Sequence, residues 1–350
     1  MGCSERLTSI IIAHSISRAV QEQLRRSQAS YLDAHVLAVF ERACNLVTRD
    51  GNVIALVLPQ VGNGPLNIVV DGPAGLFAGV DAGTWARLEG ERLRVGQLTI
   101  DLRRAAVWES RPDWDTLRTR QAVILSRLPL LSALCLRYAP PGSLLALLPD
   151  DVPGAPSSPN RCGSRCASLD EPSRAIFSAA REAAEAIREG WRGDLERLQE
   201  GAGRLAGLGG GLTPAGDDFL AGAMLWAWLT HPTPALFCYA LAEVAIPRTT
   251  ILSAAFLRAA SRGECSALWH ALLAALSEGA ETKIAAAVRQ VLAHGATSGA
   301  DALAGFISDF GSLGDFQSLT GSGGDATEMA AKIKVAAAPV RAPRPSARRK

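Results

Sequence analysis

The 350-residue sequence has few aromatic residues, little net charge and no hydrophobic run of membrane-spanning length. Its formal net charge of +2 creates no global field that would attract nucleic acid or a membrane surface. The longest apolar run, Phe219–Leu229, is about half as long as a transmembrane helix requires. We therefore expect a soluble protein whose partners include neither nucleic acid nor a membrane.

The cysteines do not form a disulfide framework or a zinc site. There are seven, and Cys162 with Cys166 is a lone pair where a zinc site would need a second one. Such usage is typical of a reducing compartment. The run Ile10–Ala13 is too short for a secretory signal, and Glu5 stands where that signal would be basic. These features predict a cytoplasmic protein.

Apolar residues are abundant enough to build a large core. Hydrophobic residues make up 48% of the chain and charged residues 20%, and the length favours two or three domains. We predict an α+β fold in which a small antiparallel β barrel or sandwich precedes a mainly α-helical domain. The predicted parts are a helical entry over 1–30, a β-rich domain over 31–112, a mainly helical domain over 113–313 with a loop or linker at 139–172, and a disordered basic tail over 314–350.

Short strands separated by turn signals define the β-rich part. Turns are marked by Asp50-Gly51, by Gly62-Asn63-Gly64-Pro65 and by Glu89-Gly90. Strands are predicted within Val36–Val47 and at Val53–Leu58, Leu66–Val70, Trp85–Leu88, Arg92–Val95, Gln97–Leu102 and Ala105–Trp108. Many short strands of this kind are typical of a barrel or a sandwich.

Helical patterns begin at residue 114. The segment 114–138 reads as one helix, and the loop 139–172 is rich in Pro, Ser, Gly and Asp. Further helices are predicted over 173–189, 191–200, 217–229, 234–244, 248–262, 264–277, 280–293 and 298–312.

A glycine-rich segment opens one of these helices. The run Leu208–Asp218 reads Leu-Gly-Gly-Gly-Leu-Thr-Pro-Ala-Gly-Asp-Asp. Glycine permits positive φ and close approach of a backbone to a ligand. Thr213 before Pro214 predicts a helix start, with threonine as the N-cap and proline at the first helical position. Because amides at a helix start attract anions, we predict that substrate binds at Gly209, Gly210, Gly211 and Thr213.

Two aspartates follow this loop and exclude an ordinary phosphate loop. Gly211 and Gly216 have the required spacing, but Asp217 and Asp218 replace its lysine and hydroxyl residue. The pair would bind a cation such as Mg²⁺, accept hydrogen bonds from a substrate NH₂ group, or supply a general base. The alternative is that both carboxylates only complement the helix dipole. We predict that Asp217 and Asp218 are the catalytic residues and the ligands of any Mg²⁺.

Two later helix starts carry further polar residues. Arg248 suits a carboxylate or phosphate, and Ser253 shares a helix face with Thr249 and Thr250. This start either holds an anion or is capped by a threonine in the ordinary way. Farther along, Ser298 and Asp301 approximate a capping box. No cysteine or serine shows the partners of a catalytic nucleophile.

These segments resemble a known family. Residues 207–222, Gly-Leu-Gly-Gly-Gly-Leu-Thr-Pro-Ala-Gly-Asp-Asp-Phe-Leu-Ala-Gly, resemble the long motif of the AllH subunit family of oxamate carbamoyltransferase. Two weaker motifs follow in the order expected for that family, at Arg248-Thr249-Thr250 with Ser253 and Gly263-Glu264, and then at Gly295-x-Thr297-Ser298-Gly299-x-Asp301-x-Leu303-x-Gly305. The sequence departs at Ala296, where the family often has histidine.

The resemblance implies a carbamoyl-transferring complex of purine or allantoin catabolism, in which this chain acts with other transferase subunits. The carbamoyl group would pass between oxalurate and phosphate, giving oxamate and carbamoyl phosphate, or another ureido compound would be the substrate. The resemblance also implies that Thr250, Ser253, Thr297, Ser298 and Asp301 lie near the glycine loop in a ligand site. The alternative is a non-catalytic subunit that binds a small anion or serves assembly.

Overall fold

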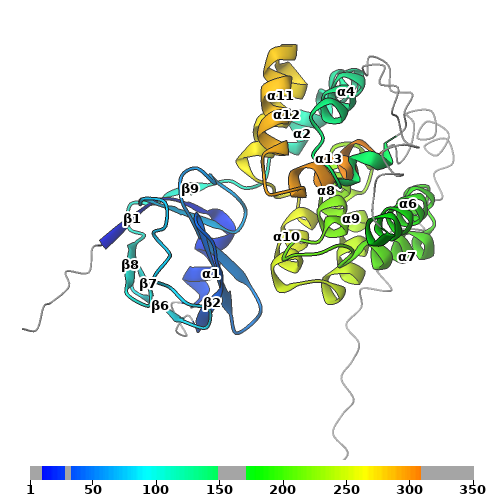
Figure 1. Ribbon diagram of the computed structural model, residues 1–350. Coiled ribbons are helices and arrows are strands. Elements are labelled where there is room, and N and C mark those ends of the chain that lie inside the picture. Colours follow the sequence, from blue (N-terminus) through cyan, green and yellow to red (C-terminus); the bar gives the residue numbers. More distant parts are fainter. Residues whose placement is uncertain (1–9, 28–32, 149–170, 309–350) are drawn as a thin grey trace, which may run out of the picture.

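The structure is a computed structural model that describes residues 10–27, 33–148 and 171–308. Figure 1 shows a β barrel built from the first part of the chain and a helical part built from the rest. The predicted α+β fold is therefore confirmed. The predicted tail at 314–350, Cys162, Cys166 and most of the loop at 139–172 lie outside the described residues.

The barrel closes because its first strand pairs on both sides. Strand β1 lies between β5 and β8, which completes a ring in the order β5-β4-β3-β2-β6-β7-β8-β1, and β9 pairs with the second half of β1. Most pairs are antiparallel as predicted, but β1–β8, β1–β9 and β4–β5 are parallel. The strands are β1 (Ile10–Ser17), β2 (Ala34–Val39), β3 (Ala43–Thr48), β4 (Val53–Val57), β5 (Asn67–Val70), β6 (Trp85–Glu89), β7 (Arg92–Val95), β8 (Leu98–Asp101) and β9 (Ala106–Trp108).

The prediction of a helical entry is wrong for β1, and α1 (Arg18–Ser27) is the helix that the described residues of this segment contain. Ile11 and Ala13 point into the barrel core, whereas Ile10 and Ile12 are about half exposed. This alternation is that of a strand, but the sequence Ile-Ile-Ile-Ala hides it because both faces are apolar.

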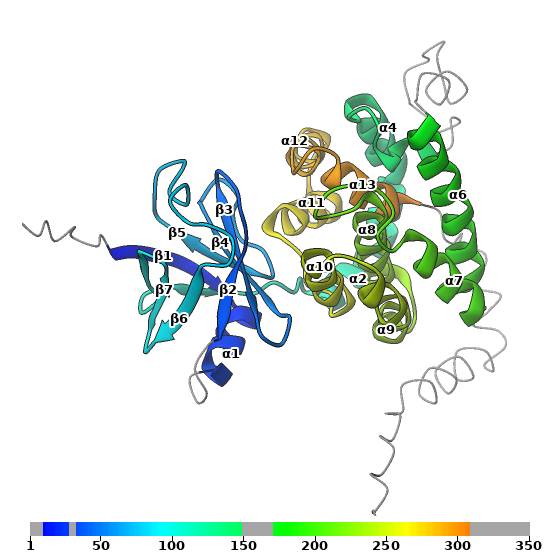
Figure 2. The ribbon, with the colours of Figure 1, turned by 60° about the horizontal axis from the view of Figure 1, so that its bottom comes forward.

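The helical part surrounds α8 (Ala215–Thr230), which contacts α2, α7, α9, α10 and α13 (Figure 2). The segment 114–138 is three helices rather than the predicted one, and its second break precedes Pro129, which lacks the amide that a continuous helix needs. None of the described helices has the length and apolar composition needed to cross a membrane. The other elements are α2 (Trp114–Thr119), α3 (Gln121–Ser126), α4 (Leu128–Tyr138), η1 (Leu144–Leu147), α6 (Glu171–Trp191), α7 (Leu195–Leu205), α9 (Pro234–Ala245), η2 (Ile246–Arg248), α10 (Ile251–Ser261), α11 (Ala267–Glu278), α12 (Glu281–Leu292) and α13 (Ser298–Ile307).

The barrel packs on the helical part through an apolar cluster of its own. Val53 and Val57 of β4 and Leu66 meet Leu252 and Ala255 of α10. Nearby, the Ala267 amide donates to the Asn63 carbonyl at 2.9 Å. These contacts bring the start of α11 and the loop before β5 together, and that region borders both cavities described below.

Two glycines let α8 and α13 cross at close range. A Cβ atom on Gly222 would lie 1.8 Å from the Ala302 carbonyl oxygen, and one on Gly305 would lie 1.9 Å from that of Phe219. No side chain tolerates such distances, so these motif glycines serve packing rather than ligand binding. The crossing brings the start of α13 beside the start of α8.

We expect Gly222→Ala and Gly305→Ala each to lower the free energy of unfolding by about 3 kcal/mol or more, because the helices must separate to admit the methyl group. Urea denaturation measures this change. Gly203→Ala in α7 is the control. Its Cβ would meet Val244 Cγ1 at an ordinary 3.4 Å, so a gain of about 0.5–1 kcal/mol is expected. A Gly222→Ala variant as stable as wild type would contradict the tight crossing.

Candidate functional site

The glycine loop joins α7 to α8 and runs over the start of α10. Gly207, Gly209 and Gly211 have φ values of 72°, 109° and 89°, which favour glycine. A Cβ on Gly207 would also lie 2.8 Å from the Arg248 carbonyl oxygen. The predicted N-cap is one residue early, since Pro214 is the N-cap and α8 begins at Ala215. Thr213 therefore lies just outside the helix, where its side chain turns toward α13.

Asp217 holds the loop to α10. It is 2% exposed, its Oδ1 accepts a hydrogen bond from the Gly207 amide at 3.0 Å, and its Oδ2 accepts one from the Thr249 hydroxyl. Both carboxylate oxygens are thus engaged by protein donors. These contacts favour the structural alternative for Asp217, and its catalytic and metal-binding roles stay predictions.

The α10 start fixes the other end of the loop. Thr250 caps α10 and donates from its hydroxyl to the Leu212 carbonyl at 2.6 Å, and the Ser253 hydroxyl lies 3.5 Å from the same oxygen. Arg248 is exposed, and its guanidinium donates to the Val244 carbonyl at 2.6 Å. The three segments do converge as predicted, but these hydroxyls bind the loop and Arg248 points elsewhere.

In the third segment, at the start of α13, Ser298 contacts the glycine loop and Asp301 lies in the core. Ser298 Oγ lies 3.1 Å from Thr213 Oγ1. Asp301 is fully buried, and its Oδ1 accepts from the Leu144 amide at 2.7 Å, so it caps η1. The predicted capping box is wrong because Thr297, not Ser298, is the N-cap of α13, and Thr297 makes no side-chain capping bond.

A cavity of about 140 Å³ opens beside the starts of α8 and α13, at the border with the barrel. Thr213, Asp218 and Ser298 lie in its wall, whereas Gly209–Gly211 and Arg248 do not. Apolar side chains such as Phe256 form much of the rest. The sequence analysis missed several polar lining residues, namely Glu264, Cys265, Ser266 and His294. Of these, Glu264 had a usable signal, because it lies within the second motif.

Asp218 is the ionisable group of this cavity whose environment is most unusual. Its pKa is raised to about 8, mainly by burial and in smaller part by the carboxylates of Asp301 and Asp217, while a hydrogen bond from Ser298 acts in the opposite direction. Its buried Oδ2 has no hydrogen-bond partner among the described residues. Asp218 is therefore mostly protonated at neutral pH and can donate a proton to a molecule in the cavity.

The aspartate pair does not fit a Mg²⁺ site. Each oxygen of Asp217 already accepts a hydrogen bond from the protein, and burial favours the neutral form of Asp218. Across the described residues, no three His, Cys, Asp or Glu side chains cluster closely enough to hold a metal.

The chain joins an eight-strand barrel to a helical part that carries a glycine loop, and a buried aspartate holds this loop in place. This two-part architecture defines its class of protein. The model of the AllH family N-terminal domain matches residues 12–107, and that of oxamate carbamoyltransferase subunit AllH matches residues 205–310. Together they span more than half of the chain. The chain belongs to the AllH family. No curated protein and no solved structure matches it.

We expect the pH dependence of stability to reveal Asp218. Its pKa is higher in the folded than in the unfolded chain, so its protonation stabilises the fold below pH 4, and this contribution is lost as pH rises through about 8. Because a tenfold change in proton affinity is about 1.4 kcal/mol, Asp218→Asn should be more stable than wild type at pH 9 by on the order of a few kcal/mol.

Denaturant unfolding between pH 5 and 9 measures the difference, with the exposed Asp81→Asn as control. Parallel curves for wild type and Asp218→Asn would show that Asp218 titrates normally. Asp217→Asn should instead be destabilised by about 1–3 kcal/mol at neutral pH, because the Gly207 amide and the Thr249 hydroxyl would face a competing NH₂ group.

Proposed function

We propose that this chain is the AllH-type subunit of a carbamoyl-transferring complex and that the small cavity beside Asp218 receives the carbamoyl group. Family membership supports the reaction class. The observation that carries the site is the carboxyl of Asp218, a residue that lines the cavity, has a pKa raised to about 8 and includes one enclosed oxygen without a hydrogen-bond partner. The substrate would be oxalurate with phosphate, or a related ureido compound, in cytoplasmic purine or allantoin nitrogen catabolism.

The reaction needs one proton to move from one substrate to the other. A phosphate oxygen attacks the carbamoyl carbon of oxalurate, and the bond from that carbon to the internal nitrogen breaks. Carbamoyl phosphate and oxamate form, and the proton of hydrogen phosphate ends on the oxamate nitrogen. Asp218 would protonate this leaving nitrogen and recover the proton from phosphate, because a general acid works best with a pKa near the operating pH.

Two hydroxyls stand beside Asp218. Thr213 and Ser298 lie 3.1 Å apart, and both line the cavity. A hydroxyl can donate to the oxygen of a carbamoyl group as negative charge develops there, and the apolar wall strengthens such a bond. Ser298 already donates its proton to Asp218, so Thr213 would replace Gly209–Gly211 as the donor nearest the reacting carbon.

The size of the cavity explains why other subunits would be needed. Ligand pockets for larger molecules typically measure about 300–1,000 Å³, and this cavity measures about 140 Å³. It suits a carbamoyl group rather than a complete pair of substrates. The remaining parts of the substrates would lie against the other transferase subunits.

The alternative proposal is a non-catalytic subunit that binds a small anion or serves assembly. Its support is that Asp217, Thr249, Thr250 and Ser253 all bind protein groups, as purely structural residues would. In that case Asp218 would contribute to ligand affinity or subunit contact and not to turnover.

The decisive experiment assembles the chain with its partner subunits and measures carbamoyl phosphate formed from oxalurate and phosphate. We expect Asp218→Asn to lower kcat by about 10²–10⁴-fold, since general acid–base catalysis typically contributes that much. The limb of the wild-type pH–rate profile near pH 8 should disappear as well.

Asp81→Asn, on the exposed surface of the barrel, serves as the matched control and should retain wild-type kcat. Absence of product from oxalurate and from other ureido acids, with every subunit present, would contradict the proposal. Substrate-induced thermal stabilisation that survives Asp218→Asn, without turnover in any combination of subunits, would instead support the non-catalytic role.

A further inference from the structure

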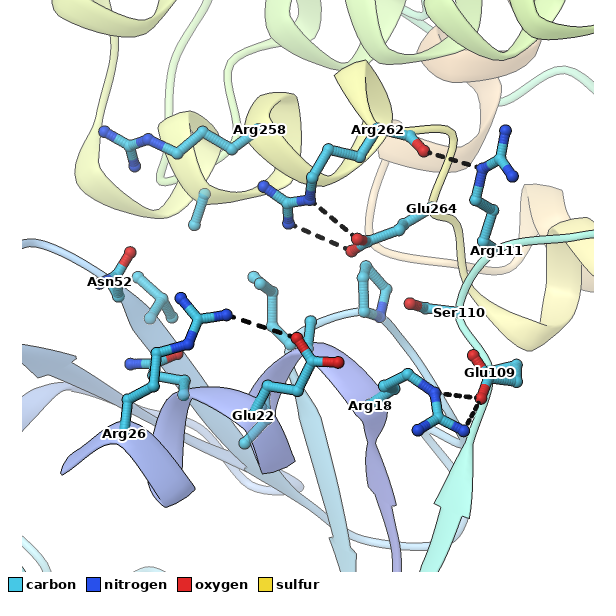
Figure 3. Close-up of a pocket in the computed structure, with 17 residues that line it drawn as sticks. Arg18, Glu22, Arg26, Asn52, Glu109, Ser110, Arg111, Arg258, Arg262 and Glu264 are labelled. Atoms are coloured by element: carbon cyan, nitrogen blue, oxygen red, sulfur yellow. Dashed lines mark hydrogen bonds and ion pairs between the residues drawn. The ribbon is translucent and has the colours of Figure 1, made fainter. Parts of the chain in front are cut away.

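A second, larger cavity lies between the barrel and the helical part. Its volume is about 500 Å³, and α1 forms one wall while the end of α10 and the following turn form the other (Figure 3). Five arginines and three glutamates line it, which leaves two positive charges in excess. The arginines are Arg18, Arg26, Arg111, Arg258 and Arg262, and the glutamates are Glu22, Glu109 and Glu264.

The charged residues of each helix are spaced so that they lie on one face of that helix. Arg18, Glu22 and Arg26 follow one another at intervals of four along α1, and Figure 3 shows them on the side of the helix that faces α10. Arg258 and Arg262 repeat the same interval on the opposite wall. Two arginine-bearing faces thus oppose each other across the cavity, an arrangement that repels unless negative charge lies between them.

The glutamates neutralise part of this charge. Arg18 pairs with Glu109, Arg262 binds Glu264 at 2.8 Å, and Arg26 lies 3.4 Å from Glu22. Arg258 is half-buried and forms no ion pair within the described part of the chain. Arg111 donates to the Arg262 carbonyl at 3.2 Å and stacks over Trp228.

Helix dipoles alone do not account for the arrangement. Arg26 and Arg258 lie in the last turns of their helices, where a cation is favourable. Arg18, however, is the first residue of α1, where the dipole disfavours a positive charge. Glu109 neutralises Arg18, so the charge left over in the described residues is that of Arg111 and Arg258, which no carboxylate pairs. A ligand would supply the negative charge that these two arginines lack.

We infer that this cavity binds a small organic anion with two negative charges, carried by a phosphate monoester or a dicarboxylate. Guanidinium groups bind both oxyanions through paired hydrogen bonds. Val53, Leu66 and Ala255 add an apolar surface at the border of the cavity, which suits an organic portion. The inference does not rest on the proposed function, because it concerns binding by this chain alone.

Isothermal titration of the full chain with glycerol 3-phosphate and with malonate, at constant ionic strength, tests the inference. We expect one molecule of at least one probe to bind per chain, and the better probe identifies the chemistry. Arg258→Gln and Arg262→Gln should each raise its Kd at least about tenfold, since each loses a charge-assisted contact. Glu22→Gln should lower the Kd, because it removes the acid that competes for Arg26.

Two controls distinguish this site from the others. Arg87→Gln, on the exposed surface of β6, removes the same charge outside the cavity and should leave the Kd within about twofold of wild type. Asp218→Asn should still bind the probe, so failure of the proposed function does not affect this test. The inference is overturned if neither probe binds, if both arginine variants bind like wild type, or if Asp218→Asn abolishes binding.

Discussion

The close approach of α8 and α13 is the constraint on which the site depends. Because Gly222 and Gly305 have no side chains, the two helices are not held apart, and the backbone of each helix contacts the backbone of the other. The starts of both helices come together as a result, which sets the Ser298 hydroxyl beside Thr213 and Asp218. Without this crossing, Asp218 would face solvent, and its pKa would have no reason to rise.

The neighbouring aspartates have different environments because a helix turns by about 100° per residue. Asp217 points toward the loop and α10, where the Gly207 amide and the Thr249 hydroxyl satisfy it as a carboxylate. Asp218 points toward the cavity, where burial and nearby carboxylates favour its protonated form. One residue therefore holds the loop through hydrogen bonds, and the next supplies a group that can exchange a proton.

The sequence predicts helices and strands well where apolar and polar residues alternate with a regular period. It predicts poorly which side chains contact one another. The strands of the barrel and most helices were recognisable, whereas β1 was not, because its outward residues Ile10 and Ile12 are as apolar as its inward ones. Gly222 and Gly305 belong to the motifs for packing reasons that only the crossing reveals. The partnership of Asp301 with Leu144 joins residues 157 positions apart, and no local spacing indicates it. Convergence of the three motifs could be inferred from the family resemblance, but the separate roles of Asp217 and Asp218 required the geometry.

The two cavities are neighbours, and two residues, Pro65 and Glu264, line both of them. Glu264 lines the small cavity beside Asp218 and the larger arginine-rich cavity, where Arg262 binds its carboxylate. An anion that engages Arg262 competes with Glu264 for the same guanidinium. Release of Glu264 would leave a less neutralised carboxylate at the edge of the small cavity, and a nearby negative charge favours protonation of Asp218. Because Glu264 lines both cavities, an anion bound in the larger cavity would act on Asp218 through this shared carboxylate.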